Sequence, residues 1–181
     1  MAERSTASDF DFIFGNWHVA NRRLTDRTDP NCADWVAFDT ESRAYPIFDG
    51  VAHIDLIDAG PGTPDGPWQG MTLRQFDPVE RVWRIWWASS KSPGHVDPPL
   101  AGRFIDGVGL FEGEDDLDGS PIKVRFEWRN PTPDTARWQQ AFSFDDGQSW
   151  VTNWVMEFTR AERAAGIAPD GPSDLRTISS A

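Results

Sequence analysis

The 181-residue sequence is poor in cysteine and tyrosine, with one of each. The single thiol, Cys32, excludes an intrachain disulfide and a metal site built from several thiolates. No run approaches the ~20 apolar residues of a membrane-spanning helix, and no stretch has the periodicity of a long amphipathic helix. The segment from Met1 to Thr6 lacks the apolar region of a secretory signal, so we expect a cytoplasmic protein.

Basic residues are also scarce, because 17 lysines and arginines stand against 29 aspartates and glutamates. The formal net charge is -12, and the basic residues are scattered rather than clustered. A surface of this charge repels phosphate backbones and anionic lipids. We therefore expect neither a nucleic-acid partner nor a membrane partner.

Large aromatic side chains, in contrast, are abundant, with ten tryptophans and twelve phenylalanines. So many apolar rings cannot all lie in water, and many of them must line a core or a cavity. A core filled solidly by tryptophan is the alternative to a hollow one.

Ten short segments of alternating, aromatic and β-branched residues predict strands, and no long helix interrupts them. Hairpin turns and loops rich in glycine and proline separate these segments. Sequential hairpins favour a closed antiparallel up-and-down β-barrel of about 8–10 strands over a two-sheet sandwich, since closure removes free strand edges. The expected strands cover residues 17–24, 34–47, 50–58, 68–76, 81–89, 101–106, 109–113, 121–129, 135–144 and 150–160.

The chain is most simply one domain with two short extensions. We expect an N-terminal arm at residues 1–9, the barrel at 10–160 and a C-terminal tail at 161–181. The aromatic segment 9–14 is expected to form a turn that plugs one end of the barrel. The proline-rich loop 89–100 is long enough to cover a mouth, and residues 114–120 are expected to form an acidic turn.

Alternation indicates which side chains face the barrel axis. In 121–129 apolar and charged residues alternate, which gives one dry and one wet face. The segments 135–144 and 150–160 repeat this pattern with tryptophan on the dry face, and Gln140 and Thr152 fall on that face as well. We expect a largely apolar ligand to be bound by Trp83, Trp87, Phe126, Trp138, Gln140, Thr152 and Trp154.

The block from Trp83 to Trp87 is apolar on both faces of its strand. One face, with Trp83 and Trp87, is expected to line the barrel. The other face carries Trp86 and must be covered, either by the N-terminal arm or by a partner subunit. This second apolar face favours a homodimer.

Three side chains are candidates for catalysis: His53, Arg74 and Arg103. The two faces of the strand that contains His53 are too similar to decide which one is internal, and an exposed His53 is favoured. An inward Arg74 or Arg103 in an aromatic cavity would bind a carboxylate, an enolate or a carbonyl group. For each arginine taken singly, an outward orientation is favoured.

Short motifs at the two ends of the predicted barrel resemble those of the lipocalin-like (calycin) barrels, including bacterial calycin-like families of unknown function. Gly15-Asn16-Trp17 opens the first strand, and Trp154 to Arg160 forms the last one. The resemblance implies that Trp17 lies at the closed end and that Arg160 packs over it and binds nearby carbonyl groups. It implies a barrel and a pocket and leaves the chemistry open.

Two functions from different classes are compatible with this sequence. The first is an intracellular barrel that binds a small, largely apolar ligand. The second is a cofactor-independent cyclase or isomerase of natural-product biosynthesis, which would act by shape and by polarising a carbonyl group. No Gly-x-Ser-x-Gly motif is present, and the three histidines have no metal-ligand spacing, so we expect neither a metal nor another cofactor. Some calycin relatives hold haem through a histidine; here only His53 or His95 could do so.

Overall fold

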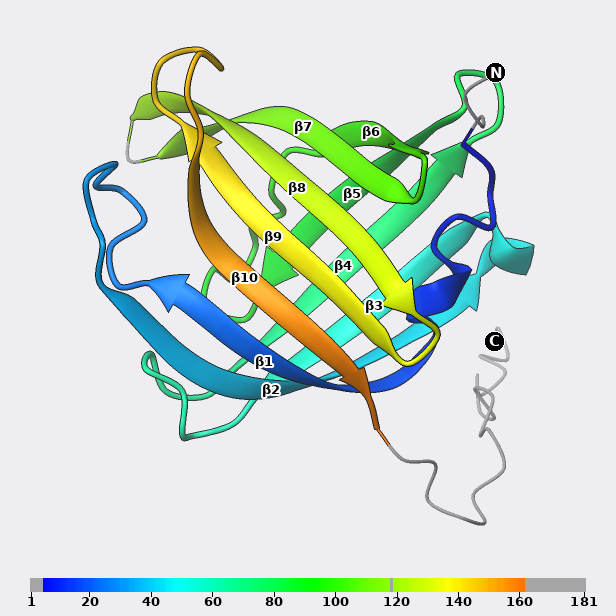
Figure 1. Cartoon of the computed structure of the whole chain (residues 1–181), viewed down its shortest axis with the longest axis horizontal. Helices are drawn as coiled ribbons and strands as arrows, with labels where there is room; N and C mark the ends of the chain where they lie inside the picture. Colours follow the sequence, from blue (N-terminus) through cyan, green and yellow to red (C-terminus); the bar gives the residue numbers. More distant parts are fainter. Residues whose placement is uncertain (1–4, 118, 162–181) are drawn as a thin grey trace, which may run out of the picture.

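The computed structural model describes residues 5–117 and 119–161, and it is a closed antiparallel β-barrel (Figure 1). Each strand pairs with the next along the chain, and the last strand pairs with the first, so the barrel has no free edge. The strands are β1 (Gly15–Leu24), β2 (Trp35–Ile47), β3 (Ala52–Ala59), β4 (Trp68–Asp77), β5 (Val82–Ser89), β6 (Leu100–Ile105), β7 (Val108–Leu117), β8 (Ser120–Thr132), β9 (Thr135–Ser143) and β10 (Val151–Arg160). The predicted all-β barrel is confirmed.

One expected turn is instead part of a strand. The acidic stretch after Gly113 continues β7 as far as Leu117 and pairs with the start of β8, where Asp115 lies opposite Ile122. Glu114 and Asp116 are exposed, so their charges remain hydrated. Asp115 points inward from this extension, which carries it to one end of the barrel.

The N-terminal segment closes one end of the barrel. It contains the short 3₁₀ turn η1 (Asp11–Ile13), which is dark blue in Figure 1. The side chains of Phe10 and Ile13 are fully buried. The described part of the expected arm packs against the barrel: Ser5 is buried, and the indole nitrogen of Trp83 donates to the carbonyl oxygen of Thr6. The expected tail at 161–181 lies outside the described residues except for Ala161.

Trp17 and Arg160 meet at this closed end, where β1 begins and β10 ends. The Arg160 guanidinium lies 4.1 Å from the centre of a Trp17 ring. It also donates to the carbonyl oxygens of Phe14 at 2.8 Å and Phe12 at 3.1 Å, which ties the plug to the last strand. The Trp17 indole donates to the Ile13 carbonyl oxygen at 2.6 Å.

The longer loops gather at the opposite end of the barrel, which is the end where loop residues line the cavity. The β1–β2, β3–β4 and β5–β6 connections and the β7–β8 and β9–β10 turns all lie at this end, where β1, β3 and β5 finish. The closed end carries the β4–β5, β6–β7 and β8–β9 hairpins and the second 3₁₀ turn, η2 (Phe48–Gly50). Any ligand path into the barrel therefore begins at the loop-rich end.

Candidate functional site

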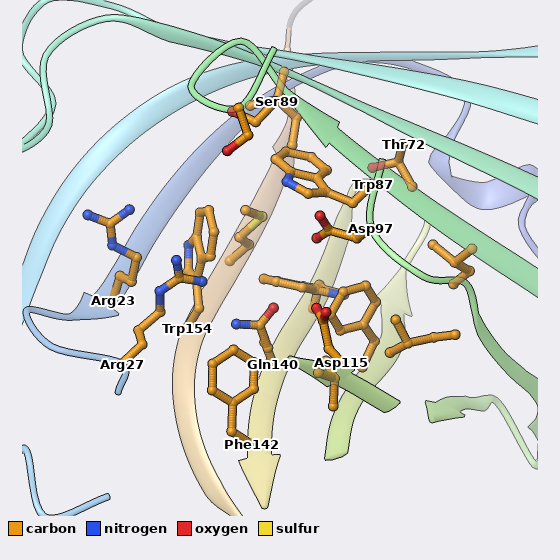
Figure 2. Close-up of a pocket in the computed structure, with 18 of the residues that line it drawn as sticks. Arg23, Arg27, Thr72, Trp87, Ser89, Asp97, Asp115, Gln140, Phe142 and Trp154 are labelled. Carbon is orange, nitrogen blue, oxygen red and sulfur yellow. The ribbon is translucent and has the colours of Figure 1, made fainter. Parts of the chain in front are cut away.

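A cavity of about 580 Å³ occupies the barrel from its open end to the level of Arg74 (Figure 2). This volume lies within the ~300–1,000 Å³ typical of ligand pockets. The walls come from β1 and from β3 to β10. The β5–β6 loop contributes the rim residues Lys91, Ser92, His95, Asp97 and Pro98. Five tryptophans therefore surround a hollow rather than fill it: Trp68, Trp87, Trp128, Trp138 and Trp154.

Aromatic rings from β8, β9 and β10 and from β4 and β5 form a continuous chain of contacts in the cavity wall. Trp138 packs edge-to-face on Trp154 with ring centres 5.7 Å apart and on Phe126 at 4.9 Å. Trp154 in turn contacts Trp68, which contacts Trp87, each at 6.2 Å. These contacts fix the ring planes, so the wall offers a preformed apolar surface.

Buried amide side chains orient two of the lining residues. The indole nitrogen of Trp154 donates to Asn21 Oδ1 at 3.0 Å, and Asn21 itself donates to Thr40 Oγ1 at 3.0 Å. Gln140 Nε2 donates to Asn153 Oδ1 at 2.8 Å. This bond uses one Nε2 hydrogen, which leaves the carbonyl oxygen and the second Nε2 hydrogen of Gln140 for a ligand.

A buried ion pair forms the inner end of the cavity. Arg74 Nη2 lies 3.0 Å from Asp55 Oδ2, and the two side chains are 1% and 2% exposed. Ser42 Oγ donates to the other carboxylate oxygen at 2.6 Å. The guanidinium lies 5.0 Å from the Phe10 ring centre and 5.1 Å from that of Trp128, so rings flank the cation.

Two guanidinium nitrogens of Arg74, Nε and Nη1, form no hydrogen bond with the described residues. Both are shielded from solvent. The pair with Asp55 is neutral overall, which suits a neutral oxygen acceptor at this end of the cavity better than a second carboxylate. Arg74 thus points inward, and the expectation that it points outward was wrong.

His53 is fully buried, so the favoured exposed position was also wrong. It lies outside the cavity lining, among the plug and closed-end rings: Phe14 lies 4.6 Å and Trp83 4.9 Å from the imidazole centre. Burial, and then repulsion from Arg74, lowers the pKa of His53 to about 4, although the backbone of Gly50 opposes the shift. The imidazole is therefore neutral at pH 7 and does not meet the cavity.

Five of the seven expected ligand-binding residues line the cavity: Trp87, Phe126, Trp138, Gln140 and Trp154. Trp83 does point inward, but it is buried in the closed-end core against Phe10, with ring centres 5.1 Å apart. Thr152 is absent from the lining because a β-bulge between Thr152 and Trp154 shifts the alternation of β10.

Arg103 also lies away from the cavity, on the exposed outer face of β6. It donates to the carbonyl oxygens of Arg81 and Glu80, at 3.1 Å each. The face it shares with Ala101 and Ile105 is exposed to solvent.

Several lining residues were not expected from the sequence: Arg23, Arg27, Asp55, Asp97 and Asp115. Strand alternation could have indicated Arg23 and Asp55, since each is an even number of residues away from inward-facing residues of its strand. Asp115 was missed because its segment was expected to turn. Arg27 and Asp97 belong to loops, where no periodicity indicates direction.

Charged side chains surround the open end in two groups (Figure 2). Arg23 and Arg27 lie near Trp154, with guanidinium carbons 5.5 and 5.6 Å from its ring centre. Asp97 and Asp115 lie apart from the arginines (Figure 2). Burial, and then repulsion from Asp115, raises the pKa of the Asp97 carboxyl above its usual value.

Within residues 5–117 and 119–161 no group of three or more histidine, cysteine or acidic side chains is arranged to hold a metal ion. In the same part of the chain, no helix has the length and apolar character needed to cross a bilayer.

A closed ten-strand antiparallel barrel, open at one end and hollow inside, fits the lipocalin-like (calycin) fold. No protein-family model matches the chain, and no curated protein matches it in sequence. Among solved structures, the S-type phycobiliprotein lyase from Guillardia theta is similar, with a TM-score of 0.57 over 87% of this chain and 93% of that chain. The two sequences are 11% identical, so the likeness concerns the fold alone.

Proposed function

We propose that this protein binds a small, largely apolar molecule inside the barrel. The observation that carries the proposal is the preformed cavity of about 580 Å³ with a continuous wall of aromatic rings. Preformed apolar cavities with a few fixed polar groups are typical of ligand sites. The structural neighbour is named a lyase of phycobiliproteins, and its likeness in fold supports a barrel of the ligand-binding kind without indicating the ligand.

The experiment is a fluorescence titration with the neutral apolar probe N-phenylnaphthylamine. We expect saturable quenching of tryptophan emission, because Trp87, Trp138 and Trp154 line the cavity. Val124→Trp places a large ring into the cavity from β8 and should abolish binding. Lys123→Trp adds the same ring on the adjacent, solvent-facing position and should leave binding intact.

Emission that stays flat during titration of the wild type would contradict the proposal. Equal binding by the wild type and Val124→Trp would place the probe outside the barrel and would contradict it as well.

The observation that favours the second hypothesis, a cofactor-independent cyclase or isomerase, is the inward Arg74, which could polarise a carbonyl group. Two features weigh against it. Asp55 neutralises the guanidinium, and His53 lies too far into the plug to act as a proton carrier in the cavity. Ligand binding is therefore the function that we propose.

A further inference from the structure

Two arginines lie side by side at the open end of the barrel, over the same indole ring. Arg23 comes from the end of β1 and Arg27 from the β1–β2 loop, and both guanidinium groups flank Trp154 (Figure 2). Trp154 is itself held by its hydrogen bond to Asn21. The arrangement joins the apolar wall directly to a positively charged rim.

The two arginines differ in how their charge is balanced. Arg23 forms a salt bridge with Asp65 of the β3–β4 loop. Arg27 forms neither a salt bridge nor a hydrogen bond with any residue that the structure describes, although its side chain is partly buried and contacts Trp154. Burial, and then repulsion from Arg23, lowers the pKa of Arg27. An anion bound beside Arg27 would offset both the desolvation of its guanidinium and the repulsion from Arg23.

Two carboxylates attract Arg27: first Asp65, which already forms a salt bridge with Arg23, and then Asp97 of the β5–β6 loop. Asp97 and Arg27 form no salt bridge. Asp97 instead lies 3.3 Å from the imidazole of His95 and is repelled by Asp115. Arg27 therefore has an unused guanidinium that faces the cavity entrance.

We propose that Arg27, assisted by Arg23, binds the acidic group of the ligand while the apolar body of that ligand lies along Trp154 inside the barrel. This inference rests on the proposed ligand-binding function and specifies its ligand class as an apolar organic acid. An oxyanion accepts paired hydrogen bonds from a guanidinium, and the partly buried rim strengthens them. The neutral Arg74–Asp55 pair leaves the inner end of the cavity for the uncharged end of the molecule.

The test compares two probes that differ by one sulfonate group, anilinonaphthalenesulfonate and N-phenylnaphthylamine. We expect Arg27→Gln to weaken binding of the sulfonate by about tenfold or more, the loss expected for a charge-assisted hydrogen bond. Binding of the neutral probe should stay within about twofold of the wild-type value. Arg27→Lys keeps the charge and should retain part of the preference.

Arg22→Gln is the matched control, since Arg22 lies on the same strand region, points outward over Trp35 and changes the net charge equally. It should alter neither affinity. Asp97→Asn removes the competing carboxylate and should strengthen binding of the sulfonate alone.

Displacement of the neutral probe by decanoate, decyl phosphate and decanol then identifies the head group. The proposal is supported if either acid displaces the neutral probe more strongly than decanol does and if this preference disappears in Arg27→Gln. The relative strength of the two acids ranks carboxylate against phosphate. Equal losses in Arg22→Gln and Arg27→Gln, or no preference for the acids, would overturn it while leaving the apolar cavity intact. Failure of the neutral probe to bind the wild type would instead overturn the proposed function itself.

Discussion

Several polar side chains near the closed end stabilise the fold through contacts that their residue types alone do not indicate. Arginine is usually found on protein surfaces, yet Arg160 packs over Trp17 and donates hydrogen bonds to two carbonyl groups of the plug. Arg74 and Asp55 are buried charges that stabilise each other. Removing one partner of such a buried pair lowers the free energy of unfolding by about 3–5 kcal/mol. His53 is a buried base kept neutral by its surroundings.

At the residue scale, His53 makes stability depend on pH. The pKa of His53 is about 4 in the folded chain, whereas the ordinary value of 6.5 applies to the unfolded chain. As the pH falls, the unfolded chain therefore takes up a proton before the folded chain does. The stabilisation is complete above pH 6.5 and is lost between pH 6.5 and about 4, by up to about 3 kcal/mol. Urea unfolding at a series of pH values measures this loss.

The control variants separate His53 from the exposed histidines. His53→Leu should flatten the dependence in that interval, while His18→Asn, at an exposed position on β1, should keep it. A wild-type dependence that survives unchanged in His53→Leu would contradict the assignment.

At the scale of elements, glycines permit two close approaches between strands. A Cβ added at Gly70 of β4 would lie 2.1 Å from the end of the Trp87 ring on β5, inside the cavity. A Cβ at Gly102 of β6 would lie 1.9 Å from the backbone carbonyl oxygen of Leu110 on β7. The first contact is with a movable side chain and the second is with the backbone.

The two alanine substitutions should therefore have different effects. Gly70→Ala should push Trp87 into the cavity and weaken N-phenylnaphthylamine binding several-fold, with the unfolding free energy changed by about 1 kcal/mol. Gly102→Ala cannot be absorbed by a rotamer change and should cost about 3 kcal/mol or more. Urea unfolding and probe titration of both variants measure these effects, and equal stability losses would contradict the distinction.

At the scale of the whole molecule, the outer surface of the barrel carries an apolar patch over β2 to β5. Cross-strand pairs align Tyr45, Ile54, Leu73 and Trp86 in one row. The next row holds Leu56, Met71 and Ala88, with Arg43 of β2 at its end. The rows contain no acidic side chain, in a protein whose net charge is -12. The patch includes Trp86, whose face of β5 was expected to be covered by the N-terminal arm or by a partner subunit.

We expect this outer patch to pair with the same patch of a second copy, since exposed rows of apolar side chains can be self-complementary about a twofold axis. Sedimentation velocity should find a dimer that dissociates on dilution. Trp86→Lys and Leu56→Lys should each yield a monomer. Val79→Lys, at a 90% exposed position in the β4–β5 hairpin, should leave the dimer intact. A wild-type monomer at all concentrations would contradict the expectation.

The sequence by itself predicted ten strands, apart from the second half of β7, the closed barrel and the inward direction of Trp87, Trp138 and Gln140. Strand alternation is a local property of the chain. The tertiary structure decided the positions of side chains that strand alternation could not predict. A bulge turned Thr152 away from the cavity, and the pairing of β3 with β4 brought Asp55 to Arg74. The plug sealed His53 off, and loops brought Arg27 and Asp97 to the mouth. Each of these depends on contacts between segments far apart in the chain, where local periodicity carries no information.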